Sequence, residues 1–117
     1  MNDANIISGN DFGKINISNE VIAVIIGTTV YETEGVVNHL ESYPANIQLL
    51  HRRTNFAKGV KVEVFDNVVN CEINTVLEVD AKITEVTTQI QQRVINAIET
   101  MLGLEVGSVD IKVSNLE

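Results

Sequence analysis

Apolar and polar positions alternate along residues 60–79, which is the pattern of two neighbouring β-strands. One side of this stretch carries mainly valine, isoleucine and leucine, whereas the other side carries polar residues that include Lys61, Glu63, Glu72 and Asn74. Asp66 and Asn67 interrupt the alternation, and both residue types tolerate the left-handed backbone of a tight turn. The pattern therefore predicts a β-hairpin with one buried face and one polar face.

Two other stretches repeat their apolar residues at steps of three and four, which predicts amphipathic helices over residues 19–34 and 82–102. Ser18 supplies a side-chain oxygen that can accept a hydrogen bond from a free N–H at the start of the first helix. Gly35 and Gly103 stand where a left-handed residue commonly ends a helix.

Shorter alternating stretches predict two further strands, one at residues 13–18 and one at residues 109–113. Between the first helix and the hairpin, Pro44 breaks any continuous helix, so residues 36–57 are expected to be irregular. The predicted order of elements is therefore βαββαβ.

This order predicts an α+β fold in which two helices pack on one face of a mainly antiparallel sheet of three or four strands. With four strands the fold would be ferredoxin-like. If the strand at residues 13–18 does not pair, an αββαβ core with three strands remains. Either arrangement leaves the second face of the sheet open. Residues 1–11 are expected to be a flexible N-terminus, and residues 12–117 are expected to form a single domain.

Composition narrows the classes of partner. The 117 residues carry a formal net charge of −8, which opposes broad attraction to nucleic acid or to anionic lipid. A single cysteine cannot form an internal disulfide, and the first residues lack the pattern of a signal peptide. The longest apolar run, residues 21–27, is far shorter than a membrane-spanning helix. A cytoplasmic location without direct membrane insertion is therefore expected.

Residue chemistry predicts no catalytic, cofactor-binding or metal site. His39 and His51 are far apart and have no cysteine at a recurrent metal-ligand spacing. Cys71 belongs to the apolar side of its strand, where a thiol acts as a small hydrophobic group. The glutamates of the hairpin fit the solvated side of a strand, and no glycine-rich phosphate loop is present. The chain is therefore expected not to be an enzyme.

Basic residues gather in residues 51–61, which include Arg52, Arg53, Lys58 and Lys61. This basic loop could dock an acidic protein surface, including that of a second copy, or it could bind RNA or anionic lipid. The acidic whole chain and the scarcity of aromatic residues disfavour RNA. The predicted partner-binding residues combine this loop with the polar face of the hairpin: Arg52, Arg53, Lys58, Lys61, Glu63, Glu72 and Asn74.

Three stretches together resemble the alkaline shock protein family of Gram-positive bacteria, also called envelope stress response proteins. They read GKINISNEVIAVIIGTTVYETEGV, KGVKVEVFDNVVNCEINTVLEV and ITEVTTQIQQRVINAIETMLGLEVGSVDIKV. The chain departs from the usual family pattern in its bulkier first helix and in Asn67, where a turn glycine is common. The resemblance implies a cytoplasmic, non-enzymatic protein linked to cell-envelope homeostasis, brought to the membrane in some members by a small membrane-anchored partner.

The functional expectation is therefore a stress and cell-envelope homeostasis protein that acts as an interaction or scaffolding module. Its expected partner is another protein or a second copy of the chain, and no small-molecule substrate is expected. The alternative is an RNA-binding module that uses residues 51–61.

Overall fold

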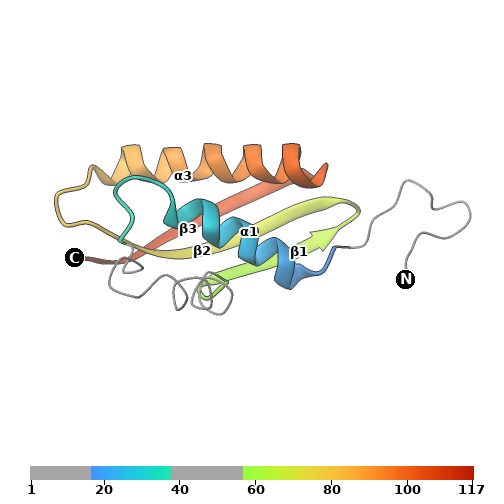
Figure 1. The fold of residues 1–117 in the computed structure, drawn as a ribbon, viewed down its shortest axis with the longest axis horizontal. Coiled ribbons are helices and arrows are strands. Elements are labelled where there is room, and N and C mark those ends of the chain that lie inside the picture. Colours follow the sequence, from blue (N-terminus) through green and yellow to red (C-terminus); the bar gives the residue numbers. More distant parts are fainter. Residues whose placement is uncertain (1–16, 38–56) are drawn as a thin grey trace, which may run out of the picture.

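The computed structural model describes residues 17–37 and 57–117. In these two ranges the chain forms two long helices, one of which ends in a π-helical turn, and three strands (Figure 1). In chain order the elements are α1 (Asn19–Tyr31), β1 (Val60–Phe65), β2 (Val68–Leu77), α3 (Ile83–Ala97), η3 (Ile98–Leu102) and β3 (Glu105–Leu116).

Helix α1 begins as the sequence predicts and ends earlier. The Ser18 side chain accepts a hydrogen bond of 3.2 Å from the backbone N–H of Val21. The helix stops at Tyr31 rather than at residue 34, and turns follow up to Gly35. Gly35 has a φ of 95°, and a Cβ atom there would lie 2.7 Å from a methyl group of Val86 in α3. This position therefore needs glycine both for its backbone and for the close approach of α3.

The hairpin of β1 and β2 is confirmed, and the predicted turn residues form its turn. Asp66 and Asn67 have φ values of 55° and 64°, which is the left-handed geometry that a two-residue hairpin turn requires. The strands pair in antiparallel register from Val60 opposite Ile73 to Phe65 opposite Val68. Strand β2 lies between β1 and β3 and is the centre of the sheet.

The sheet is mixed, so the expectation of a mainly antiparallel sheet is wrong. Strand β3 runs parallel to β2, from Val68 opposite Glu105 to Leu77 opposite Leu116. The reason is that α3 carries the chain back along the full length of the sheet, so that β3 starts at the end where β2 starts (Figure 1). Gly103, with a φ of 68°, ends the helical segment as predicted and lets the chain turn into β3.

The described residues confirm the αββαβ alternative and not the ferredoxin-like one. In a split βαβ arrangement another strand lies between the two parallel strands, whereas here β2 and β3 pair directly. The strand predicted at residues 13–18 lies mostly outside the described residues, and Ile17 and Ser18 are not in a strand.

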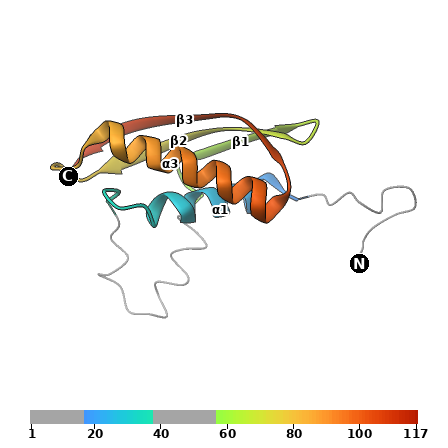
Figure 2. The same ribbon diagram turned by 90° about the horizontal axis from the view of Figure 1, so that it is seen from above.

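Both helices lie on one face of the sheet, and the core fills the space between the two layers (Figure 2). Every second residue of β2 from Val69 to Leu77 points into this core. The largest fully buried side chains come from both helices and from β2: Ile22, Ile26, Ile73, Leu77, Ile90, Ile98, Val69 and Val94. The other face of the sheet carries no helix among the described residues, as the sequence predicts.

Candidate functional site

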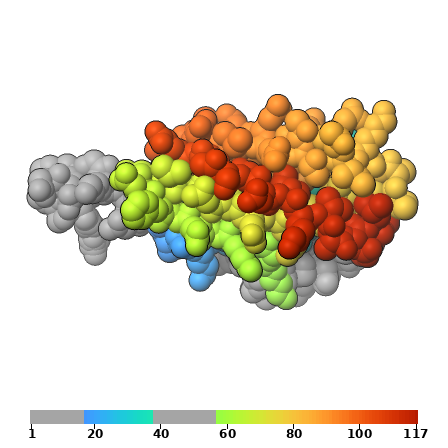
Figure 3. All heavy atoms as spheres, turned by 180° about the vertical axis from the view of Figure 1, so that it is seen from behind, coloured from blue at the N-terminus to red at the C-terminus, as the bar shows by residue number. Residues whose placement is uncertain are grey.

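The face of the sheet that the helices leave uncovered is polar and charged, and we call it the open face. Figure 3 shows it from the side opposite the helices. Side chains alternate along a strand, so the residues of β2 between the buried ones belong to this face. Its charged and amide side chains come from all three strands: Lys61, Glu63, Asn70, Glu72, Asn74, Asp110 and Lys112.

The strand register arranges these side chains in rows across the sheet. Lys61 lies opposite Glu72, and Glu72 lies opposite Asp110. The next row towards the C-terminal end of β3 sets Asn74 beside Lys112. All five side chains are exposed, so the open face offers both signs of charge within two neighbouring rows. Such a surface suits a partner with matching charges better than a purely acidic or basic polymer.

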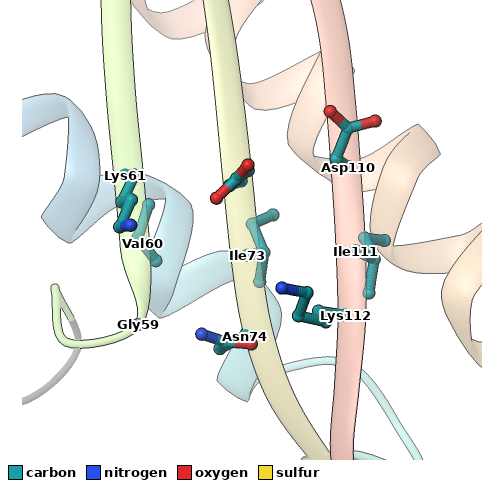
Figure 4. Close-up of a pocket in the computed structure, with 9 residues that line it drawn as sticks. Gly59, Val60, Lys61, Ile73, Asn74, Asp110, Ile111 and Lys112 are labelled. Atoms are coloured by element: carbon teal, nitrogen blue, oxygen red, sulfur yellow. The ribbon is translucent and has the colours of Figure 1, made fainter.

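A shallow hollow of about 180 Å³ follows these two rows. Figure 4 shows Lys61, Asn74, Asp110 and Lys112 around it, on three adjacent strands. Ile73 and Ile111 also line the hollow, although their side chains point to the helix side, and their strands form the middle and one edge of the sheet. Most residues that line the hollow are exposed residues of three adjacent strands, and its volume is below the usual range for a small-molecule site.

Four of the predicted partner-binding residues share the open face. Lys61, Glu63, Glu72 and Asn74 lie on β1 and β2 with exposed side chains. Lys58 is exposed in the turn that precedes β1. Arg52 and Arg53 lie outside the described residues, as do His39 and His51.

Asp110, Lys112, Asn70 and Ser108 belong to the same face but were not among the predicted partner-binding residues. The Ser108 side chain donates a hydrogen bond of 2.9 Å to the Asn70 side chain across β2 and β3. The alternation of residues 109–113 already indicated which side chains of the last strand are polar. Alternation identifies the two faces of a strand but not its neighbour, so it could not place these side chains beside those of β2.

Cys71 is part of the core behind the open face. Its side chain is buried, and burial raises the pKa of the Cys71 thiol to about 11, with the negative charge of Asp110 acting in the same direction. A thiol with such a pKa stays protonated at neutral pH and is a poor nucleophile. The expectation that this thiol acts as a small hydrophobic group is confirmed by its place in the core.

A second, more acidic hollow lies at the start of α3. Glu34, Glu78, Asp80 and Glu85 line it, and Lys82 forms an exposed ion pair of 3.8 Å with Glu85. In the part of the chain that the structure describes, no group of three or more histidine, cysteine, aspartate or glutamate residues is arranged to hold a metal ion. Within that same part, neither helix has the length and apolar character needed to cross a membrane.

Comparison with known proteins assigns the chain to a family. Three relatives align with about nine-tenths of it. The uncharacterized protein Spy1614 of Streptococcus pyogenes is 36% identical over 107 residues, covering 90% of this chain and 88% of the relative. The uncharacterized protein YloU of Bacillus subtilis is 30% identical, with coverage of 90% and 89%. The uncharacterized protein YqhY of the same organism is 25% identical, with coverage of 90% and 78%. No solved structure matches the chain.

The family match spans nearly the whole sequence, from residue 8 to residue 117, and so includes α1, the hairpin, α3 and β3. It agrees with the resemblance found in the three stretches of sequence described above. The chain belongs to the alkaline shock protein 23 family, which is described as having a cell envelope-related function.

Proposed function

We propose that this chain is a non-enzymatic interaction or scaffolding module that serves cell-envelope homeostasis. The observation that carries the proposal is the open face, on which five charged side chains of both signs lie on adjacent strands. A face of this kind is a flat, hydrogen-bonding surface that another protein can cover. The family's cell envelope-related description supports the setting.

The partner in this proposal is a second copy of the chain or another protein, for instance a small membrane-anchored one. The module itself works in the cytoplasm, and contact with the membrane comes through the partner. Charge complementarity would fix the orientation of the partner and speed its encounter, whereas rows of exposed charges would add little affinity on their own.

The alternative of RNA binding finds less support in the described residues. Lys61 belongs to the basic loop of the sequence, but on the sheet it lies opposite Glu72 and two residues before Glu63. Phosphate groups that approached Lys61 would meet these carboxylates. A fluorescent RNA titrated with the chain should show no binding near physiological salt; steeply salt-dependent binding there would favour the alternative.

Charge reversal tests the proposal. Glu72→Lys changes the centre of the open face, and Glu99→Lys makes the same chemical change in the exposed η3 turn of the helix layer. Light scattering coupled to size exclusion, over a range of protein concentrations and at two salt concentrations, measures self-association. Capture of a tagged wild-type copy and of co-purified envelope proteins measures partner binding.

The expected result is that Glu72→Lys reduces assembly or capture and that Glu99→Lys behaves as the wild type. Equal behaviour of both variants and the wild type in both measurements would contradict an interaction role for the open face. Far-UV circular dichroism and thermal unfolding of each variant exclude loss of the fold as the cause.

A further inference from the structure

The two outer edges of the sheet differ in how far they are covered. Strand β1 has six residues, and the Asn19 side chain at the start of α1 donates a hydrogen bond of 3.2 Å to its Val62 carbonyl. Strand β3 has twelve residues, and among the described residues it pairs with β2 on one side and with no strand on the other. An unpaired edge of this length is a ready template for another strand.

The hydrogen-bond pattern shows which backbone groups of β3 face outward. The Asn74 N–H donates to the Gly59 carbonyl over 2.7 Å, so the even-numbered residues of β2 face β1. The Glu117 N–H donates to the Leu77 carbonyl over 2.9 Å, so the odd-numbered residues of β2 face β3. Cys71 lies opposite Val109 in the parallel register and therefore bonds to the neighbours of Val109. The backbone groups of Val109 itself point away from β2.

By the same alternation the N–H and C=O groups of Ile111 and Val113 also point away from β2. The register between β2 and β3 shifts after Val69 and again after Thr75. Between these two shifts the pairing is regular, and this regular part of the β3 edge runs from Ser108 to Val113. The Gln91 side chain of α3 donates a hydrogen bond of 3.2 Å to the Val109 carbonyl, which confirms that this carbonyl is directed outward. A carbonyl oxygen has two lone pairs and can accept a second bond.

Side chains in this window set the chemistry of a matching strand. Asp110 and Lys112 project onto the open face, whereas Val109, Ile111 and Val113 point to the helix side. Neither Asp110 nor Lys112 forms an ion pair with another described residue. An antiparallel segment that pairs with this edge would gain from a basic residue opposite Asp110, an acidic residue opposite Lys112 and apolar residues between them.

The position of α3 limits what can occupy the edge. Helix α3 lies in the helix layer (Figure 2), and from behind its atoms are seen along the outer edge of β3, on the side away from β2 (Figure 3). A second copy joined edge to edge by a two-fold axis would bring its own α3 beside the first. Adjacent strands are about 4.8 Å apart, whereas packed helices need about 8–10 Å between their axes. A lone extended segment in the plane of the sheet brings no second helix, so this helix-helix conflict does not arise.

We infer that the outer edge of β3, from Ser108 to Val113, binds an extended segment of a partner protein by antiparallel β-strand addition. The segment alternates apolar residues with one basic and one acidic residue, placed opposite Asp110 and Lys112. This inference rests on the proposed function, because it names one way in which the module holds a partner. It concerns the edge of the sheet, whereas the proposed function concerns its open face.

The chain itself supplies a suitable probe. Residues 108–114 read SVDIKVS. A peptide of this sequence can pair antiparallel with the same segment of the chain so that its isoleucine lies opposite Ile111. Its lysine then lies opposite Asp110 and its aspartate opposite Lys112. A labelled, end-capped peptide of this sequence is titrated with the full chain by fluorescence anisotropy. The matched control is SVKIDVS, which has the same composition and sets like charges opposite each other.

The peptide SVDIKVS should bind saturably, and SVKIDVS should bind about tenfold more weakly, because two cross-strand attractions become two repulsions. The relative affinities of the two peptides should reverse with the double variant Asp110→Lys, Lys112→Asp. Both positions are exposed, so the double substitution does not alter the core. Methylation of the central isoleucine N–H of the peptide, which would bond to β3, should abolish binding. Methylation of the adjacent aspartate N–H, which would point away, should not.

Binding should also slow hydrogen exchange at the Ile111 amide, which faces outward in the free chain. Equal affinity for the two peptides, or equal effects of the two methylations, would overturn the inference. So would a dimer of the full chain that protects the Ile111 amide from exchange in the absence of peptide, because the edge would then belong to a second copy. If the peptides fail and Glu72→Lys still disrupts assembly or capture, the inference fails and the proposed function stands.

Discussion

The Gln91 side chain reaches from α3 to the backbone of β3 and donates a 3.2 Å hydrogen bond to the carbonyl oxygen of Val109. This bond joins the helix layer to the outermost strand, and it satisfies one acceptor that the sheet itself leaves unpaired. Replacing Gln91 by alanine should lower the free energy of unfolding by about 0.5–1.5 kcal/mol, the usual net value of one hydrogen bond.

Gln92 provides the control for this prediction. It is exposed on the same helix, and no hydrogen bond to its side chain is seen among the described residues. Urea unfolding of the Gln91→Ala and Gln92→Ala variants measures the difference. Equal losses in the two variants would mean that the bond to Val109 contributes nothing.

Gly35 should tolerate alanine much less well than Gly103. Both have positive φ values, 95° and 68°, so each substitution carries a backbone cost of about 1 kcal/mol. At Gly35 the new Cβ would also lie 2.7 Å from a Val86 methyl group, whereas at Gly103 no atom lies within 4 Å. We expect Gly35→Ala to cost at least about 1–3 kcal/mol more than Gly103→Ala. Thermal unfolding of both variants checks this difference.

The Cys71 thiol should make the fold less stable at high pH. Its pKa is raised to about 11 in the folded chain, above the ordinary value of 9.0. Between these two values the unfolded chain has lost the thiol proton and the folded chain still holds it, so stability falls as pH rises. The limiting slope is about 1.4 kcal/mol per pH unit from this group.

Urea unfolding at pH values from about 8 to about 11, a range that includes the ordinary and the raised pKa of the thiol, measures this loss. The Cys71→Ala variant is the control, because it removes the titrating group and should show a smaller slope over the same window. An identical pH dependence in the variant would show that the thiol does not contribute.

Burial should separate two isoleucines of α3. The Ile90 side chain is fully buried, whereas Ile83 is 45% exposed at the start of the helix. Ile90→Ala should cost about 2–5 kcal/mol, because it removes core contacts and leaves a cavity, and Ile83→Ala should cost much less. Chemical denaturation of both variants tests the prediction; similar costs would contradict the layer packing described here.

Local patterns in the sequence predicted the elements of this fold well. The hairpin followed from strict alternation and from a turn pair, Asp66 and Asn67, that adopts the expected left-handed backbone. The second long helix and its end at Gly103 followed from periodicity and from one glycine. The first helix was harder, because it is apolar on nearly every side; Val21 is 49% exposed, whereas the next residue, Ile22, is buried.

The pairing of β3 could not be predicted, because alternation identifies a strand but not its neighbour or direction. The same limit applied to the candidate site. Lys61, Glu63, Glu72 and Asn74 were expected on one polar face, and the structure places them there. Asp110 joins them only because α3 returns the chain to the end of the sheet where β2 begins.

The parallel pairing of β2 with β3 also sets the order in which the domain can be completed during synthesis. Strand β2 is the centre of the sheet, yet one of its two neighbours begins only at Glu105, after the whole of α3 and η3. Until that strand has left the ribosome, the sheet has only the two strands of the hairpin beside the helices, and the edge of β2 that β3 later pairs with stays open. The nascent chain therefore gains its stable fold late, and a chaperone that shields Ile73 and Leu77 would act in that interval.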